Sequence, residues 1–417
     1  MSITRFRHLA PISIIIGFAL TLRLWRLNLP KGYIFDEVYY AKNAASLITD
    51  GVELNDQGAA EFVVHPPLGK WLIGIGIKLF GNNEFGWRVI AAVVGTASVL
   101  LIYLIVQRLF SSLFLSNVAA ALFALDGLHL VMSRVALLDI FLMFFILLAF
   151  YLILRDNLWL SGVVIGLAAA TKWSGVFVIP FLILLTVNIG GANFATWGKR
   201  FNQFVLTPIG IYLLSWSGWF ISSKGWARDS GSNLFSSLWN YHVEIMNFHR
   251  GLTEQHTYAA NPWSWLVLGR PTSFYYESTK DCGAQSCSQE ILAIGAIAIT
   301  VGLFIANRDR VSAFILAGIA GTYLPWFFIQ NRTTFYFYAI AIFPFIVLSL
   351  INVFNWALVL SLINVFNWAL NNQINRKLVY GFVIAVGINF IYFLPIFIGI
   401  NIPYVDWLAR MLLPSWI

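Results

Sequence analysis

The chain has 417 residues, of which 59% are hydrophobic, 17% aromatic and only 11% charged. A soluble domain carries about 25% charged residues, so this composition excludes a soluble globular protein and indicates one that crosses a membrane repeatedly. The net charge of +8 would suggest nucleic acid in a soluble protein, but in a membrane protein it reflects positive inner loops, and no nucleic-acid partner is expected.

Eleven segments are apolar and approach or reach the length of about 20 residues that crosses a bilayer. They are predicted to be helices, because a backbone in lipid must satisfy its own hydrogen bonds and the alternation of a membrane barrel is absent. The expected spans are 9–27, 86–108, 113–131, 136–154, 158–171, 173–191, 201–221, 290–306, 312–330, 334–356 and 378–400. The predicted fold is an all-α polytopic membrane protein.

Loop charges predict the orientation of these spans. With the N-terminus in the cytoplasm, the inner loops hold the basic residues Arg5, Arg7, Arg108, Arg155, Lys199, Arg200, Arg308, Arg310, Arg376 and Lys377. Those loops contain only two acids, Asp156 and Asp309, and every other acid falls on or near the opposite face. The positive-inside rule therefore places the chemically equipped face outside the cytoplasm.

Two outer loops, 28–85 and 222–289, are long and rich in aromatic residues. We expect short interfacial helices in both of them. Cys282 and Cys287 lie in the second loop, where an oxidising compartment would allow a disulfide. Two cysteines without a nearby His pair do not make a zinc site.

One internal repeat is present: the twelve residues "VLSLINVFNWAL" occur at 347–358 and again at 359–370. Two copies are too few for a solenoid, so a local duplication is the preferred interpretation. We expect it to extend the cytoplasmic end of the tenth span, away from the face of the protein that carries the catalytic residues.

Charged side chains at the membrane edge are costly and are therefore candidates for function. The outer set comprises Asp36, Glu37, His65, Lys70, Arg88, Arg134, Asp139, Lys172 and Arg332. Such a set suits transfer from an anionic lipid phosphate to a neutral hydroxyl, because a carboxylate can take the proton while Arg and Lys hold the phosphate.

Each of these residues also has a structural alternative. Arg88 could snorkel to the interface, and Arg134 and Asp139 could form a structural ion pair. His65 could cap a turn. Adjacent acids commonly form a solvated face, and they point in different directions on a helix, so at most one of Asp36 and Glu37 is expected to transfer a proton directly.

Several longer motifs carry a resemblance to a known family. The stretches "FDEVYYAKNA", "FVVHPPLGKWLIGIG", "FGWRVIAA", "LDGLHLVMSRVALLDIFLMFF", "ATKWSGVF" and "MNFHRGLTEQHTYAANPWSWLVLGRP" occur in this order between residues 30 and 340. They resemble the protein O-mannosyltransferases that use a polyprenyl-phosphate-mannose donor. The loop 222–289 is too short for the β-trefoil domain of fungal and animal members, so the bacterial branch is the better match.

The resemblance implies a GT-C glycosyltransferase fold, in one transmembrane unit over residues 1–417, with an active site at the outer face of the plasma membrane. It implies an inverting transfer of mannose from the lipid phosphate to Ser or Thr of a secreted or membrane protein, during its translocation. By this resemblance Asp36 is the base and Glu37 its companion. The resemblance assigns Arg88, Lys172, Arg134 and Asp139 to the donor phosphate and its pocket, and the charged outer set adds Lys70, His65 and Arg332 as candidates for binding the donor. Asn247, His249 and Glu254 are candidate acceptor contacts, with a purely structural loop as the alternative.

One position departs from the eukaryotic pattern, since Val63 stands where an Asp commonly precedes the HPP motif. The acids near Asp36 are spread along the chain, whereas a metal needs several that converge, so we expect no metal cofactor. Two alternatives stay open: a GT-C enzyme that glycosylates a lipid or a glycan, as the lipid A aminoarabinose transferases do, and a transporter or flippase. The transporter is disfavoured because no pseudo-symmetric halves are found.

Overall fold

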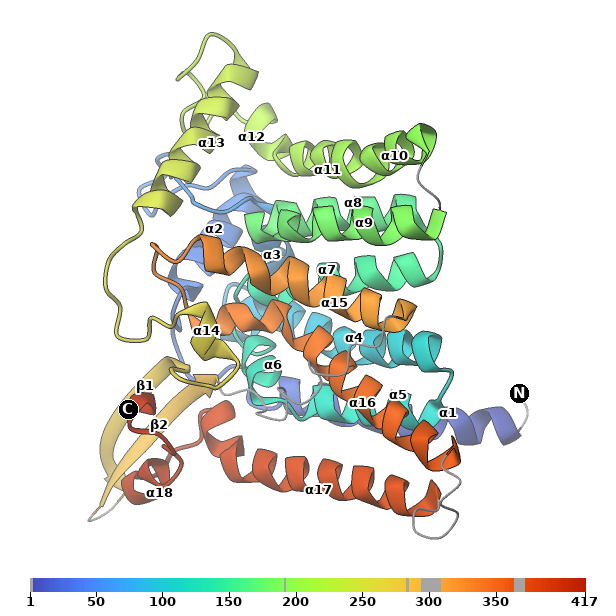
Figure 1. The fold of residues 1–417 in the computed structure, drawn as a ribbon. Coiled ribbons are helices and arrows are strands. Elements are labelled where there is room, and N and C mark those ends of the chain that lie inside the picture. The colour runs from blue at the N-terminus through green and yellow to red at the C-terminus, as the bar shows by residue number, and fades with distance from the viewer. Residues whose placement is uncertain (1–2, 191–192, 283–284, 294–308, 364–371) are drawn as a thin grey trace.

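The computed structural model describes residues 3–190, 193–282, 285–293, 309–363 and 372–417. Long helices run side by side, and the two chain termini lie at opposite ends of this bundle (Figure 1). We call the end with the N-terminus the N-terminal end, and the other end, where α2, α3, α13, α14 and the β-sheet gather, the loop-rich end. The fold is predominantly helical, as the hydropathy pattern predicts.

Four helices of the first half begin at polar capping residues. Asn83, Ser112, Asp126 and Asn157 each accept a hydrogen bond from the main-chain N–H three residues ahead, which satisfies one of the free donors of a first turn. The helical segments are α1 (Ile3–Leu24), α4 (Glu84–Phe110), α5 (Leu113–Ala124), α6 (Gly127–Met132), α7 (Asp139–Leu154), α8 (Leu158–Thr171), the 3₁₀-helix η1 (Trp173–Val178) and α9 (Ile179–Gly190). They occupy the first six expected spans.

The second half of the bundle is less regular, because several expected spans are broken into short helices. Its segments are α10 (Phe194–Phe201), the π-helix η2 (Asn202–Leu206), α11 (Thr207–Ser215), α12 (Ser217–Ile221), α15 (Arg310–Tyr323), the 3₁₀-helices η4 (Leu324–Phe328) and η5 (Tyr336–Ala341), α16 (Phe343–Ile363) and α17 (Asn372–Phe397). Among the described helical stretches, three are by themselves long and apolar enough to cross a membrane: Glu84–Phe110, Arg310–Phe328 and Arg376–Phe397.

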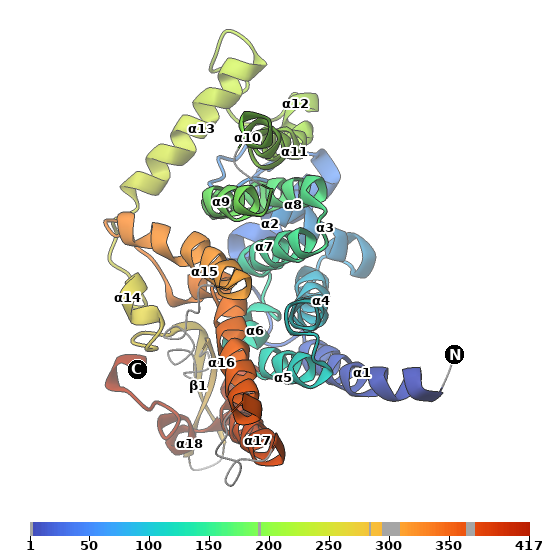
Figure 2. The same cartoon turned by 45° about the vertical axis from the view of Figure 1, so that its right-hand side comes forward.

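The long helices pack as a row with a second group beside it. Helices α11, α8, α7, α4 and α5 follow one another as packed neighbours, and α15 and α16 lie against this row (Figure 2). Within this second group a small residue permits close packing, since a Cβ on Gly318 of α15 would meet the ring of Phe345 of α16 at 2.0 Å. The two groups meet along a long apolar interface.

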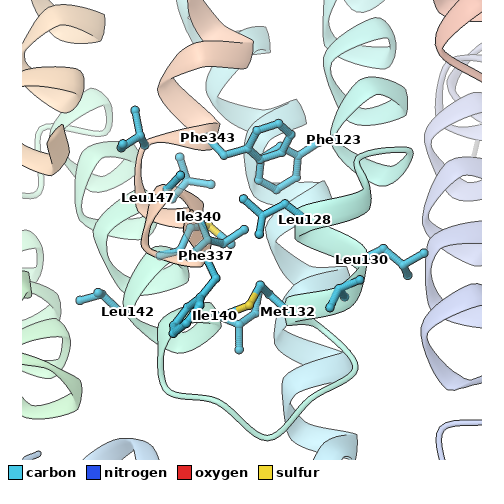
Figure 3. Packing of buried hydrophobic residues seen from close by; sticks show 14 of the residues in the cluster. Phe123, Leu128, Leu130, Met132, Ile140, Leu142, Leu147, Phe337, Ile340 and Phe343 are labelled. Atoms are coloured by element: carbon cyan, nitrogen blue, oxygen red, sulfur yellow. The ribbon is translucent and has the colours of Figure 1, made fainter. Parts of the chain in front are cut away.

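The hydrophobic core lies where α5, α6, α7 and η5 meet. Phe123 stacks on Phe343 with 4.9 Å between ring centroids, and Leu128, Ile340 and Leu147 pack next to this pair (Figure 3). These elements also carry charged residues at the loop-rich end, so packing in the core fixes where those charged residues lie.

Short helices gather at the loop-rich end, as expected for the two long loops. They are α2 (Glu37–Asp50), α3 (Leu68–Phe80), α13 (Leu234–Gly251), α14 (Pro262–Trp265), α18 (Tyr404–Leu408) and the 3₁₀-helix η6 (Pro414–Trp416). Helix α13 buries Leu238, Tyr241 and Ile245 against a small separate cluster.

A small antiparallel sheet at the loop-rich end is absent from the predicted elements. Strand β1 (Thr272–Cys282) pairs with β2 (Gln285–Ala293), and β2 pairs with the short β3 (Ile402–Pro403). Cys287, opposite Thr279, is disulfide-bonded. The expected span 290–306 is therefore wrong at its start, because residues 290–293 complete a strand; its residues 294–308 lie outside the described part of the chain. Local hydropathy could not separate the apolar end of this strand from the beginning of a span.

The tandem repeat falls on α16, which runs from the loop-rich end toward the N-terminal end (Figure 1). The first copy, 347–358, lies within this helix, and Leu348 and Ile351 belong to the core. The second copy begins in the last turns of α16, and its residues 364–370 lie outside the described part.

Candidate active site

Asp36 stands where a linker from α1 enters α2. It occupies the N-cap position of α2, but its carboxylate makes no capping bond. The carboxylate lies instead near Lys172, Asp139 and the hydroxyl of Tyr40. Burial raises the pKa of Asp36 to about 6, because desolvation disfavours the charged form more than Lys172 favours it. Asp36 is thus a carboxylate that is ionised at neutral pH and more basic than usual.

An aromatic cluster determines how the chain reaches Asp36. Phe35 has a φ of +51°, a left-handed conformation that non-glycine residues rarely adopt. Its ring meets those of Phe274 and Phe337 edge-on, with centroids 5.0 and 5.6 Å away. These contacts come from β1 and η5, so distant parts of the chain hold the turn that presents Asp36.

Glu37 is fully buried, with 0% exposure, and is used for structure. Its two oxygens accept hydrogen bonds from Nε and Nη2 of Arg88, both at 2.8 Å. They also accept from the main-chain N–H groups of Ile34 and Ala136, each at 2.9 Å. Glu37 therefore joins the start of α2 to α4 and to the segment before α7. Both of its carboxylate oxygens are bonded within the protein, so neither is available to a substrate.

Arg88 is also 0% exposed, and all of its N–H groups are engaged. Besides Glu37, it donates to the carbonyl oxygens of Leu27, Pro30 and Gly32 at 3.1–3.2 Å. No donor remains for a ligand. The direct role in donor-phosphate binding expected from the sequence therefore does not fit, and Arg88 fastens the linker to α4 instead.

Arg134 and Lys70 likewise bind the chain itself. Arg134 donates to carbonyl oxygens at the end of α1, among them those of Leu22 and Trp25 at 2.9 and 2.7 Å. Lys70 forms a buried ion pair with Glu53 at 2.5 Å and donates to the carbonyl of His65. Neither side chain is among those that line the cavity described below, where a donor contact is expected.

Lys172 and Asp139 form the charged pair nearest to Asp36. Nζ of Lys172 lies 2.9 and 3.0 Å from the two carboxylate oxygens of Asp139 and 4.3 Å from the ring centre of Tyr338. Asp139 begins α7 and Lys172 ends α8, so the pair forms across a helical hairpin. Asp139 pairs with Lys172 and not with Arg134, which had been the structural alternative.

A cavity of about 780 Å³ extends from Lys172. One part has polar walls, contributed by His65, Lys172, His242, His249, Arg250 and Arg332. The other part runs between apolar side chains of η1, α9, η2 and α11, including Val176, Ile179, Val205 and Ile209. A cavity with cations in one part and an apolar trough in the other suits a phosphate attached to a long hydrocarbon chain.

Two histidines in the polar part are neutral at pH 7. Burial, with help from Arg332, lowers the pKa of His249 to about 4. Nδ1 of His249 accepts from Arg332 at 3.3 Å, so its Nε2–H donates to the carbonyl of Val64 at 3.0 Å. Burial also holds the pKa of His65 well below its usual range, and its buried Nδ1 has no hydrogen-bond partner among the described residues. His65 can thus offer one polar ring atom to a ligand.

The residues predicted to bind an acceptor are only partly brought together. His249 reaches the cavity, whereas Asn247 and Glu254 are exposed and do not line it. The main-chain carbonyl of Glu254 accepts a hydrogen bond from the hydroxyl of Thr333. This contact joins the loop after α13 to the segment before η5, so Glu254 contributes through its backbone.

Sequence reasoning missed several residues of the site. Tyr40 and Tyr338 surround the charged pair, and Arg250 lines the cavity. Arg250 directly follows His249 within a motif already noted, so its position was a usable signal. Tyr338 carried no such signal, because it lies in an apolar span. In the described part of the chain, no group of three His, Cys, Asp or Glu side chains could hold a metal ion.

Comparison with known families gives matches over much of the chain. A model described as dolichyl-phosphate-mannose-protein mannosyltransferase matches residues 64–219, and one described as the C-terminal four TMM region of protein-O-mannosyltransferase matches residues 234–308. The polyprenol-phosphate-mannose–protein mannosyltransferase of Mycolicibacterium smegmatis is 31% identical, covering 82% of this chain and 80% of that protein. That of Mycobacterium tuberculosis is 31% identical, covering 76% and 74%.

Solved structures share the fold. The Saccharomyces cerevisiae protein O-mannosyltransferase Pmt1-Pmt2 complex bound to the sugar donor contains a chain that superposes with a TM-score of 0.81 at 15% identity, covering 99% of this chain and 93% of that one. ArnT from Cupriavidus metallidurans gives a TM-score of 0.56 at 17% identity, covering 96% and 71%. The architecture is that of the GT-C membrane glycosyltransferases.

Proposed function

The chain belongs to the family of polyprenol-phosphate-mannose–protein mannosyltransferases, and from this premise we propose that Asp36 is the base for mannosyl transfer to Ser or Thr of a protein. The chain is accordingly a membrane-embedded glycosyltransferase, and the transporter alternative is set aside. The observation that carries the proposal is the position of Asp36, whose basic carboxylate lies near Lys172, one of the cations that line the cavity.

The reaction needs one base and one group that stabilises phosphate. The acceptor hydroxyl oxygen attacks C1 of mannose while its proton passes to Asp36, and the bond from C1 to the phosphate oxygen breaks. Polyprenyl phosphate leaves with the bonding electrons, and attack opposite the leaving group inverts the anomeric centre. A placed general base contributes about 10²–10⁴ in rate, which a weakly nucleophilic hydroxyl requires.

Lys172, Arg332 and Arg250 are the cations that we assign to the donor phosphate, because all three line the cavity. Their charges stabilise the phosphate as it leaves. Asp139 holds Lys172 in place, and the unpartnered Nδ1 of His65 provides a polar contact in the same part. The apolar trough between α9 and α11 accommodates the start of the polyprenyl chain.

Glu37, Arg88, Arg134 and Lys70 are positioning residues in this proposal. Their buried bonds fix the linker and α2, and hence Asp36, relative to Lys172. The pair of adjacent acids thus divides into a catalytic residue, Asp36, and a structural one, Glu37.

We place the loop-rich end outside the cytoplasm of a plasma membrane, with the N-terminus inside. Two features support this sidedness. The disulfide-bonded Cys287 lies in β2 at that end, and disulfides persist in oxidising compartments. The basic residues Arg108, Arg155 and Arg310 lie at the opposite end, as inner loops require. A secreted or membrane protein would then meet Asp36 as it is translocated.

A protein acceptor is favoured over a lipid or glycan acceptor by the named relatives, which are protein mannosyltransferases. The likeness to ArnT is one of fold alone. The experiment that separates the acceptors uses the purified protein with polyprenyl-phosphate [³H]mannose and a Ser/Thr peptide. Label in the peptide supports the proposal, whereas label that reaches only lipid or glycan overturns it.

We expect Asp36→Asn to lower peptide labelling by about 10²–10⁴, because the substitution keeps the side-chain volume and removes the base. The matched control is Asp56→Asn, since Asp56 is an exposed acid of the same loop that pairs with Lys42. The control should label the peptide like the wild type. Near-normal transfer by a folded Asp36→Asn protein would overturn the assignment of the base.

A further inference from the structure

A second cavity, of about 480 Å³, lies toward the N-terminal end of the bundle, between the end of α7, α9 and the start of α15. Its walls are apolar except for one side chain, and they include Ile153, Phe181, Leu185, Phe314 and Ala317. Neither catalysis nor donor binding, as proposed above, uses any of these residues.

The two cavities follow one another along the contact of η1 and α9 with η4 and α15. The first is lined by η1, the start of α9 and η4, and the second by residues 181–185 and 310–320. Between them the end of η1 touches α15, because a Cβ on Gly321 would meet Cα of Val178 at 2.8 Å. The close contact separates the second cavity from the trough assigned to the donor.

The second cavity opens sideways toward lipid. Leu184 and Leu316, which line it from α9 and α15, are 53% and 43% exposed. An apolar space of this kind does not hold ordered water, which needs polar partners. Hydrocarbon is the filling that such walls favour.

The rim of the second cavity is basic. Arg310, the first residue of α15, lines it, and Arg108 donates from Nε to the carbonyl of Leu154, another lining residue, at 3.1 Å. Arg155 follows Leu154 in the chain. None of these three arginines forms an ion pair with a described carboxylate, and all three are exposed. The nearby Asp309 caps α15 through Ser312 N at 2.6 Å.

We propose that the second cavity binds an anionic phospholipid of the leaflet at the N-terminal end. One acyl chain lies between α9 and α15, and the phosphate lies between Arg310 and Arg108. Guanidinium groups suit this contact because their paired N–H groups match phosphate oxygens. Basic pockets between transmembrane helices are known to select anionic headgroups. The site is independent of the mannosyl transfer proposed above.

The test is native mass spectrometry of the purified full chain with phosphatidylglycerol or phosphatidylcholine of equal acyl length. We expect phosphatidylglycerol to be retained more strongly. Arg310→Gln should lower its retention about fivefold, as expected for roughly 1 kcal/mol per cation near a headgroup. The matched control is Arg376→Gln, since Arg376 is an exposed cation of the same end that lies over Phe114. It should retain phosphatidylglycerol like the wild type.

A second variant tests the apolar half of the site. Ala317→Trp fills the space between α9 and α15 and should reduce retention of phosphatidylglycerol, while binding of polyprenyl phosphate persists. Equal retention of the two phospholipids by the wild type would overturn the proposal, as would an Arg310→Gln protein that binds like the wild type. Loss of polyprenyl phosphate, with phosphatidylglycerol unaffected in Ala317→Trp, would assign the cavity to the donor chain and overturn it equally.

Discussion

At the scale of one residue, two opposing effects set the pKa of Asp36, the proposed base. Burial raises its pKa to about 6, and Lys172 pulls it down. The base is available only when deprotonated, so its available fraction grows as the pH rises through 6. His249, with a pKa near 4, and His65, whose pKa is also depressed, stay neutral over that interval. Their titration should therefore not affect how the reaction rate depends on pH over that interval.

We therefore expect kcat/KM for peptide mannosylation to rise about tenfold per pH unit below about pH 6 and to level off above it. Lys172→Met removes the charge that lowers the pKa of Asp36, so its residual activity should show the same profile shifted to higher pH. The measurement is initial rate against pH at subsaturating acceptor. A flat wild-type profile between pH 5 and 7 would contradict the role of Asp36.

Arg88 is a charged residue that we assign to positioning the linker and not to binding the substrate. Arg88→Lys keeps the charge but cannot reproduce the paired bonds to Glu37 together with those to three carbonyls. We expect kcat to fall by up to about 100-fold, because a misplaced base loses alignment, while KM for the donor stays unchanged.

Arg332→Lys provides the matched comparison for Arg88→Lys, because Arg332 lines the cavity and should mainly raise KM for the donor. Steady-state kinetics with varied polyprenyl-phosphate mannose separates the two residues. A raised donor KM in Arg88→Lys would return Arg88 to the phosphate site predicted from the sequence.

Individual elements differ in how far the sequence could predict them. The pair of Asp139 and Lys172 was within reach, because α7 and α8 form a hairpin with a short loop, which brings the start of one beside the end of the other. The sheet was not within reach. Its strand β2 ends in apolar residues that precede a longer apolar stretch, and its pairing with β3 joins residues more than 100 positions apart.

The roles of Arg88 and Arg134 also could not be predicted from the sequence. Apart from Glu37, which pairs with Arg88, their partners are main-chain carbonyls of residues 22–32, and any residue type offers a carbonyl. No motif can therefore reveal that these arginines bind the linker and not a phosphate. Asp36 could be proposed as a site residue from the sequence, by contrast, because its signal is a side chain in a specific motif.

The distribution of charge over the whole molecule favours a site that works without a metal. The carboxylates nearest to Asp36 already have cations of the chain as partners, since Asp139 pairs with Lys172 and Glu37 with Arg88. A divalent cation would have to displace these buried bonds. Metal independence stays a prediction, and this pairing supports it.

We expect peptide mannosylation by the purified protein to be unaffected by millimolar EDTA, and added Mg²⁺ or Mn²⁺ to give no stimulation. The assay is the transfer of label to the peptide after chelation and gel filtration. Activity that is lost with EDTA and restored by one of these cations would contradict the prediction and point to a metal bound by oxygen ligands.

The hydrogen bonds between Arg88 and the linker affect which changes of amino-acid sequence the linker can tolerate. Leu27, Pro30 and Gly32 offer carbonyl oxygens to Arg88, and those bonds do not depend on their side chains. The feature of the linker that must be kept is therefore the course of its backbone, more than the identity of its side chains. Proteins with different residues there could still carry Asp36 to the same place, as long as the backbone follows the same course past one arginine.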